Sequence, residues 1–303
     1  MAAVSIPPPQ PNATKYKVAL LQLPVSPRKE ENIARARARL DAAAAAGATL
    51  VVLPARGAPS DGGVLFQEIW NCPYSMETLP SHGEDIDGGA SPSVSMLSEV
   101  AARRRITILH LFEIDIPGDI TFRESDTFTA GQEPTIVDTD VGRIGIGICH
   151  DIRFPELAML YRSRGAHLIC YPSAFNMSTG QLLWDLMQKS RAVDNQLFVV
   201  TCSPARDPNA ESDYMIWGHS SLIGPFGEVI ATAGHEEATV VGEIDHSMIQ
   251  TIRDNLPLEM QRREDLYSTH WLMSGENLQA TRHAPLDQMH NCNEVKMALQ
   301  PWK

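Results

Sequence analysis

Short apolar runs alternate with longer helical segments along most of the chain. Residues 18–23, 29–46 and 50–53 have the patterns of a strand, a helix and a strand, and Gly47 marks the end of the helix. The alternation continues through a helix at 93–105, strands at 106–112 and 143–149, a helix at 155–164, a strand at 167–171, a helix at 181–195 and a strand at 198–202. Because strands that alternate with helices usually pair within one sheet, this pattern predicts an α/β fold.

The last third of the sequence changes to hairpin patterns. Strand patterns at 222–223 and 228–231 flank the turn sequence GPFG, and a further strand at 239–244 precedes a helix at 248–255. The sheets should therefore be mixed. We predict one domain over residues 16–270, between a Pro-rich disordered leader at 1–15 and a polar tail at 271–303.

Composition excludes several classes of protein. A chain of 303 residues with 43% hydrophobic residues can build a large core, while its net charge of -12 repels nucleic acids and anionic membranes. No stretch is typical of a signal peptide or a membrane span, which predicts a cytoplasmic protein. Five cysteines without paired spacing argue against disulfides and structural zinc, and the acidic segment 76–91 fits a solvated surface better than a metal site.

The stretch at 142–156, GRIGIGICHDIRFPE, contains the main candidate for chemistry. An apolar strand is predicted to end at Cys149, and Pro155 suits the first turn of the following helix. Backbone N–H groups at a helix start favour a thiolate and can bind an oxyanion, as acyl transfer requires. An inert buried cysteine is an equally open interpretation, because free cysteines are commonly buried.

Two other interpretations of this stretch are weaker. Its glycines follow the order GxxGxG inside a strand, which differs from the dinucleotide-binding pattern, so Gly145 and Gly147 are better explained by close packing. His150 beside Cys149 could form a Cys/His dyad, but adjacent side chains on an extended chain point to opposite faces.

Six runs in this order resemble the nitrilase (carbon-nitrogen hydrolase) superfamily, in particular its ω-amidase branch. They are YKVALLQL at 16–23, HLFEIDIPG at 110–118, GICHDIRF at 147–154, SRAVDNQ at 190–196, SPARD at 203–207 and WGHS at 217–220. The resemblance implies a four-layer α-β-β-α sandwich that assembles into homodimers or larger homo-oligomers and uses no metal or other cofactor. It also implies hydrolysis of a small amide through an acyl-enzyme on cysteine, aided by a glutamate base and a lysine.

The resemblance assigns three catalytic positions. Cys149 matches the nucleophile, and Glu124 matches a second glutamate of the pocket. The base normally follows Leu-Pro directly, whereas here Ala55 follows Pro54; removing residues 55–67 would join Pro54 to Glu68, so Glu68 matches the base behind an inserted loop. Such a loop costs little closure entropy but separates the base from the strand that would position it.

The lysine of the family has no counterpart. Its position corresponds to Ile108, and the chain contains no lysine between Lys29 and Lys189. The hairpin that relatives have before His110 is also missing, which predicts that part of one sheet is absent. The arginines at 103–105 do not replace a compact ammonium group.

Three further residues are candidates for substrate binding. Arg153 could clamp a substrate carboxylate with its forked guanidinium, although a surface residue at a helix start explains it equally well. Ser173 and Phe175 follow a strand end, where α/β sheets usually place pocket residues. The sequence thus predicts an ω-amidase for 2-oxoglutaramate and 2-oxosuccinamate with impaired activity, or alternatively an inactive member of the family that pairs with intact subunits.

Overall fold

The fold is described from a computed structural model. It describes residues 11–54, 91–93, 96, 113–116, 120–123, 130–131, 133–207, 214–263 and 265–267. The chain divides into two units, Met1–Trp271 and Leu272–Lys303, and every described residue belongs to the first. The predicted insert at 55–67, the helix at 93–105 apart from residues 93 and 96, the strand at 106–112 and the tail at 271–303 lie outside the described residues.

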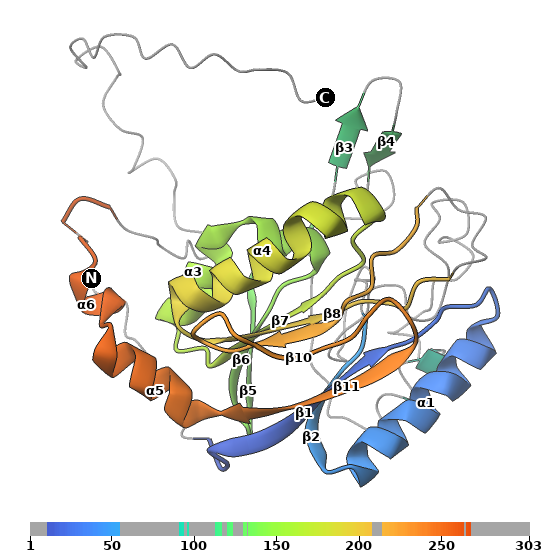
Figure 1. Cartoon of the computed structure of the whole chain (residues 1–303), viewed down its shortest axis with the longest axis horizontal. Helices are drawn as coiled ribbons and strands as arrows, with labels where there is room; N and C mark the ends of the chain where they lie inside the picture. Colours follow the sequence, from blue (N-terminus) through green and yellow to red (C-terminus); the bar gives the residue numbers. More distant parts are fainter. Residues whose placement is uncertain are drawn as a thin grey trace. The chain divides into compact units, whose positions relative to one another are not determined.

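The described elements follow one another largely in the predicted order (Figure 1). They are β1 (Lys15–Gln22), α1 (Lys29–Ala45), β2 (Ala48–Val52), β3 (Glu113–Ile116), β4 (Ile120–Arg123), β5 (Thr135–Thr139), β6 (Gly142–Ile146), the 3₁₀ helix η3 (Cys149–Arg153), α3 (Pro155–Ser163), β7 (Leu168–Pro172), α4 (Met177–Asn195), β8 (Phe198–Cys202), β9 (Ser221–Ile223), β10 (Val229–Thr232), β11 (Ala238–Asp245), α5 (His246–Asn255) and α6 (Leu258–Gln261).

The first sheet has the order β11-β1-β2. β1 and β2 are parallel and joined through α1, which confirms the predicted strand-helix-strand unit. α1 ends as expected before Gly47, whose φ of +83° reverses the chain at little cost because glycine has no Cβ. β11 returns antiparallel along the whole of β1.

The second sheet has the order β10-β9-β8-β7-β6-β5. β6, β7 and β8 are parallel to one another, while β5, β9 and β10 pair antiparallel, so the predicted mixed sheet is confirmed. The sequence interpretation missed β5, a short strand whose residues Thr135, Asp138 and Thr139 weaken the apolar signal. β3 and β4, also missed as strands, pair with each other.

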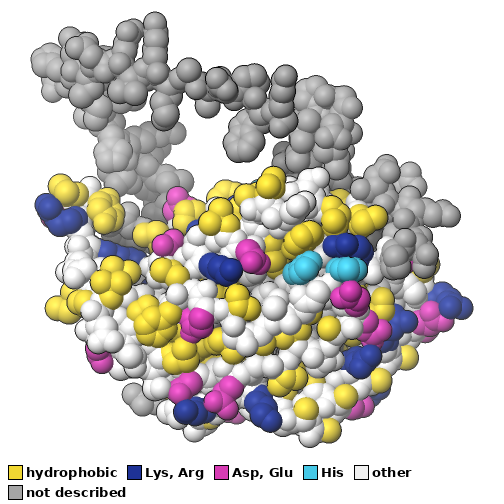
Figure 2. Space-filling model, viewed as in Figure 1, with side chains coloured by type: hydrophobic (Ala, Val, Ile, Leu, Met, Phe, Trp, Pro, Cys, Tyr) yellow, Lys and Arg dark blue, Asp and Glu magenta, His cyan; other side chains and the backbone are white. Residues whose placement is uncertain are grey.

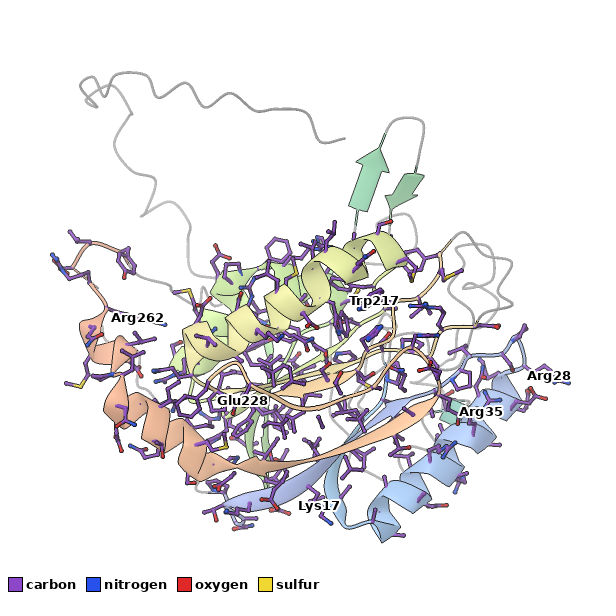
Figure 3. All side chains as sticks on the ribbon, in the orientation of Figure 1. Lys17, Arg28, Arg35, Trp217, Glu228 and Arg262 are labelled. Atoms are coloured by element: carbon purple, nitrogen blue, oxygen red, sulfur yellow. The ribbon has the colours of Figure 1, made fainter. Side chains whose placement is uncertain are left out.

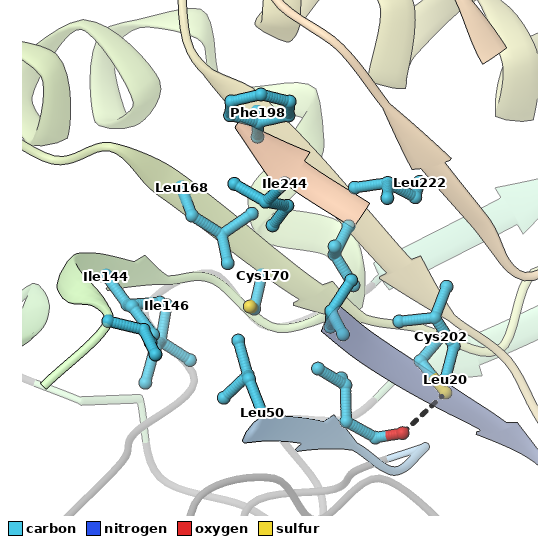
Figure 4. Close-up of a cluster of buried hydrophobic side chains, with 14 of the residues drawn as sticks. Leu20, Leu50, Ile144, Ile146, Leu168, Cys170, Phe198, Cys202, Leu222 and Ile244 are labelled. Carbon is cyan, nitrogen blue, oxygen red and sulfur yellow. Dashed lines mark hydrogen bonds between the residues drawn. The ribbon is translucent and has the colours of Figure 1, made fainter. Parts of the chain in front are cut away.

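Three hydrophobic clusters separate the four layers. Val18 and Leu20 of β1 face the six-stranded sheet, while their neighbours Ala19 and Leu21 face Leu40 and other residues of α1. Strands of the larger sheet alternate in the same way, since Leu168 and Cys170 point to the smaller sheet, and Ile169 and Tyr171 point to α3 and α4. Figure 4 shows the layer between the two sheets, where Leu20 and Leu50 meet Ile146 and Leu168. The predicted four-layer α-β-β-α sandwich is therefore confirmed.

The predicted boundaries needed correction at the most important strand. β6 ends at Ile146, not at Cys149, because its residue pairing with β7 ends there and η3 begins at Cys149. α4 begins at Met177 instead of residue 181, because Asn176 caps it by accepting a hydrogen bond from the Thr179 N–H at 2.8 Å.

Part of the predicted leader is bound to the domain, and α4 exposes apolar side chains on its surface. Residue Asn12 of the predicted leader is hydrogen bonded to Asp140 through its backbone and its side chain. α4 exposes Leu182 and Leu186, and Figure 2 shows hydrophobic and charged side chains interspersed on this face. The homo-oligomer remains a prediction. No helix in the described ranges is long and apolar enough to cross a membrane.

Candidate active site

Cys149 lies at a sharp turn between β6 and η3. Its φ of +45° is in the left-handed region, which is uncommon for residues other than glycine and is found preferentially at functional sites. The side chain is half-buried, whereas Cys170 and Cys202, the other described cysteines, are fully buried in the core. Burial raises the pKa of both core thiols, which keeps them protonated. Among the described cysteines, Cys149 is thus the one in a position to react.

Hydrogen bonds hold the chain on both sides of this turn. The Gly147 N–H donates to the Cys170 carbonyl at 3.0 Å, which extends the contact with β7 beyond the last residue of β6. The Ile148 N–H donates to Oδ2 of Asp151 at 2.8 Å, and Asp151 is fully buried. Asp151 therefore closes the start of η3 with its carboxylate, an arrangement that also suits the positive end of a helix.

Close packing explains the glycines of β6 and the turn. A Cβ on Gly145 would come within 2.6 Å of the Tyr161 ring, and one on Gly147 within 2.5 Å of Tyr171. Both distances are below ordinary contact, so the predicted packing role of these glycines is confirmed. Tyr161 also donates a hydrogen bond to the Ile146 carbonyl at 2.5 Å, which fixes the end of β6 against α3.

Arg153 and Phe175 come together next to Cys149. The guanidinium carbon of Arg153 lies 5.2 Å from the centre of the Phe175 ring, a cation–π arrangement. Burial lowers the pKa of Arg153, and the nearby Cys149 and Tyr214 side chains oppose that shift. A guanidinium that is half-buried beside a thiol and an aromatic ring is well placed to recognise an anion.

The other candidate at this edge, Ser173, is more enclosed. It follows β7 and is fully buried; its N–H donates to the Cys202 carbonyl at 2.9 Å and its hydroxyl to the Tyr171 carbonyl at 3.1 Å. Contact with a substrate would require the hydroxyl to exchange this bond. Phe175 is also buried, and its ring packs edge-on against Trp184.

The geometry around His150 differs from the extended chain assumed from the sequence. Cys149 and His150 are consecutive residues of η3, where successive side chains are about 120° apart. The His150 ring packs edge-on against Phe154, with 5.4 Å between the ring centres. The extended-chain argument against a Cys/His dyad therefore does not apply here, and the absence of a dyad stays a prediction.

Some predicted site residues cannot be placed, and two residues near Cys149 were not foreseen from the sequence. Glu68, Glu124 and Ile108 lie outside the described residues, so their roles stay predictions. Sequence reasoning gave no role to Arg191, whose side chain reaches the backbone of η3, or to Tyr214, which donates to the Ala174 carbonyl at 2.7 Å. The only signal for Arg191 was its place in the SRAVDNQ run. The described residues contain no group of three or more His, Cys, Asp or Glu side chains arranged to hold a metal.

The segments that frame this site also connect α4 to the second half of the chain. The Trp217 N–H donates to the Phe175 carbonyl at 2.8 Å, and Trp217 lies beside α4 (Figure 3). A Cβ on Gly180 of α4 would come within 2.3 Å of the Trp217 side chain. Arg206 donates to the Ile216 and Trp217 carbonyls at 2.9 and 3.0 Å. These bonds hold the residues that follow Tyr214.

Comparison with known proteins identifies clear similarities. The sequence profile of the carbon-nitrogen hydrolase family matches residues 109–254. An Arabidopsis thaliana protein named omega-amidase, chloroplastic, is 52% identical over 297 residues, covering 87% of this chain and 76% of the relative. Omega-amidase NIT2 of Homo sapiens is 40% identical over 287 residues, covering 84% and 98%. The crystal structure of Saccharomyces cerevisiae Nit3, a member of branch 10 of the nitrilase superfamily, matches with a TM-score of 0.69 at 35% identity, covering 82% of this chain and 97% of that one.

Proposed function

Because this chain belongs to the carbon-nitrogen hydrolase family, we propose that it hydrolyses the amide bond of a small substrate that carries a carboxylate, with Cys149 as the nucleophile. Relatives named omega-amidases support an amidase-type reaction. The observation that carries the assignment to this site is the half-buried Cys149, held at a positive φ where β6 passes into η3, with the Arg153 guanidinium nearby.

The reaction divides into two steps. The Cys149 sulfur attacks the amide carbon, the thiol proton passes to a base, and the C–N bond breaks as the nitrogen takes up a proton and leaves as ammonia. Water then attacks the thioester and releases the carboxylic acid together with the free thiol. We propose Glu68 as the base and Glu124 as a second acid of the pocket. N–H groups at the start of η3 are suited to stabilise the oxyanion.

Arg153 and Phe175 suggest the class of substrate. A forked guanidinium can bond both oxygens of a carboxylate, and its partial burial strengthens that interaction. A short dicarboxylic acid monoamide carries the amide that the thiol would attack and the carboxylate that the guanidinium would bind. We therefore propose 2-oxoglutaramate and 2-oxosuccinamate as substrates, which would give the 2-oxo acid and ammonia.

An ammonia-release assay tests the proposal directly. Purified protein should release ammonia from 2-oxoglutaramate. Cys149→Ala should lower the rate to the background measured without enzyme. Cys170→Ala serves as a matched control, because its thiol lies in the core and not at the site. Equal rates in the wild type and Cys149→Ala would contradict the proposed function.

A second candidate function follows from the position of the missing lysine. Ile108 cannot supply the positive charge that the family uses, and the chain contains no other lysine between Lys29 and Lys189. The absence of this lysine is what we would expect of an inactive family member that assembles with intact subunits. The ammonia assay and a copurification experiment together separate the two candidates, because an inactive assembly partner would release no ammonia from 2-oxoglutaramate but would copurify with an active subunit.

A further inference from the structure

Arg191 lies in the SRAVDNQ run but has no role in the proposed reaction. It is on α4 and only 8% exposed. Its Nε donates to the Ile152 carbonyl at 2.9 Å, and its Nη2 donates to the Arg153 carbonyl at 3.2 Å. One guanidinium thus binds two consecutive carbonyls at the end of the helix that begins with Cys149.

These carbonyls need an external donor. The last carbonyls of a helix have no partner within it, and the residue that would donate to Ile152 in a 3₁₀ pattern is Pro155, which has no N–H. A cation at the C-terminal end of a helix is also favourable, because the aligned peptide dipoles place partial negative charge there. Arg191 supplies both the donors and the charge.

A second observation places Arg191 close to the other end of the turn. Burial raises the pKa of the Tyr171 phenol, and the positive charge of Arg191 opposes that shift. Tyr171 is the residue against which Gly147 packs, two positions before Cys149. The charge of Arg191 therefore acts on the residue that supports the turn, while its guanidinium binds the end of η3.

We propose that Arg191 is a positioning residue, which fixes η3 through the Ile152 and Arg153 carbonyls and thereby sets the Cys149 thiol and the Arg153 side chain relative to each other. These two residues are the first and last of η3, so a rotation of this short helix would move both. The positive φ of Cys149 makes such support necessary, since strained backbone persists only where its surroundings hold it. The expected effect on catalysis rests on the proposed function, whereas the effect on the geometry of Cys149 and Arg153 does not.

Alkylation of Cys149 by two reagents measures this geometry without turnover. The thiolate sulfur displaces iodide from iodoacetamide, which is neutral, or from iodoacetate, whose carboxylate resembles that of the proposed substrate. The ratio of the two rates cancels the intrinsic reactivity of the thiol and reports the position of Arg153. Mass spectrometry of the peptide that contains Cys149 separates its reaction from that of Cys72 and Cys292.

Arg191→Lys is the test variant, because it keeps the charge and loses the fork that reaches both carbonyls. Arg143→Lys is the matched control: Arg143 is also 8% exposed and binds a carbonyl, that of Arg164, but it lies near the start of β6, away from Cys149. We expect Arg191→Lys to lower the ratio of the iodoacetate rate to the iodoacetamide rate about tenfold. This is the factor that one charge-assisted hydrogen bond contributes. Its amidase kcat/KM should fall about 100-fold, as for a displacement of about an ångström. Arg143→Lys should change neither by more than about twofold.

An unchanged ratio in folded Arg191→Lys would overturn the proposal. Arg191→Ala provides a second variant, in which low millimolar guanidinium chloride should restore part of the ratio. Loss of folding in both variants would assign Arg191 to stability alone and would also overturn it. A wild-type protein without turnover would contradict the proposed function but not the positioning role, because alkylation requires no substrate.

Discussion

Arg153 is the residue on which substrate choice should depend. It lies beside Cys149, with its guanidinium over the Phe175 ring. We expect Arg153→Met to raise the KM for 2-oxoglutaramate about 30-fold, since a hydrogen bond to a charged group contributes about 1.5–3 kcal/mol. Steady-state kinetics on this substrate and on an amide with a methyl group in place of the carboxylate check the prediction. A similar loss for both amides would show that Arg153 acts on folding or on the thiol.

The sequence predicted where the candidate nucleophile Cys149 lies along the chain, but not how it is held. The apolar run and Pro155 placed Cys149 at a strand-to-helix junction, and the structure places it there with a shift of three residues in the strand end. Gly147 and Ile148 continue the apolar pattern, so periodicity alone could not reveal that they leave the ladder. Arg191 lies 42 positions beyond Cys149 in the sequence, and contacts between a side chain and a distant carbonyl leave no spacing pattern.

At the scale of elements, Gln22 connects the two sheets at the end of β1. It is fully buried, and its Nε2 donates to the Gly234 and Glu236 carbonyls at 2.8 and 2.6 Å. Its Oε1 accepts hydrogen bonds from the N–H and the hydroxyl of Ser220, immediately before β9, at 2.9 and 2.8 Å. One amide thus satisfies polar groups from two segments, the residue before β9 and the connection between β10 and β11.

We expect Gln22→Leu to lower the free energy of unfolding by about 3 kcal/mol, because buried polar groups left without partners cost about 1–3 kcal/mol each. Gln250→Leu is the control, since Gln250 is exposed on α5 and its side chain donates to Asp254 of the same helix. Its effect should stay within about 0.5 kcal/mol. Urea denaturation measures both, and equal small effects would show that the Gln22 contacts add little to stability.

The elements that could be predicted are those whose apolar pattern is visible in the local sequence. The strand at 198–202 matches β8 at both ends, because four of its five residues are apolar and all five are buried. β5 was missed because its place depends on pairing with β6, which half-buries a mixed sequence. The pairing of β11 with β1, more than 200 residues apart, likewise has no local signal.

At the scale of the whole described domain, two histidines lie where both sheets and α5 meet. The rings of His167, before β7, and His246, at the start of α5, are stacked with 4.8 Å between their centres. Tyr16 of β1 packs edge-on against His246, and the Arg143 N–H donates to Nδ1 of His167 at 3.1 Å. Burial lowers the pKa of His167 to about 4, assisted by the charges of His246 and Arg253, and burial also lowers the pKa of His246.

These shifts predict a loss of stability in mild acid. Both histidines have lower pKa values folded than unfolded, so the unfolded chain binds more protons below pH 6.5, and folding stability falls as the pH decreases from about 6.5 towards 4. Each histidine contributes at most about 1.4 kcal/mol per pH unit in this window. The double variant His167→Gln, His246→Leu removes both groups, and the glutamine can still accept the bond from Arg143. Urea titrations between pH 7 and 4.5 should therefore give a shallower dependence for the variant, and identical slopes would show that the two histidines do not cause the acid sensitivity. Asp245, whose pKa is lowered to about 2 by its hydrogen bonds with Lys15 and Ser247, acts mainly below this range of pH.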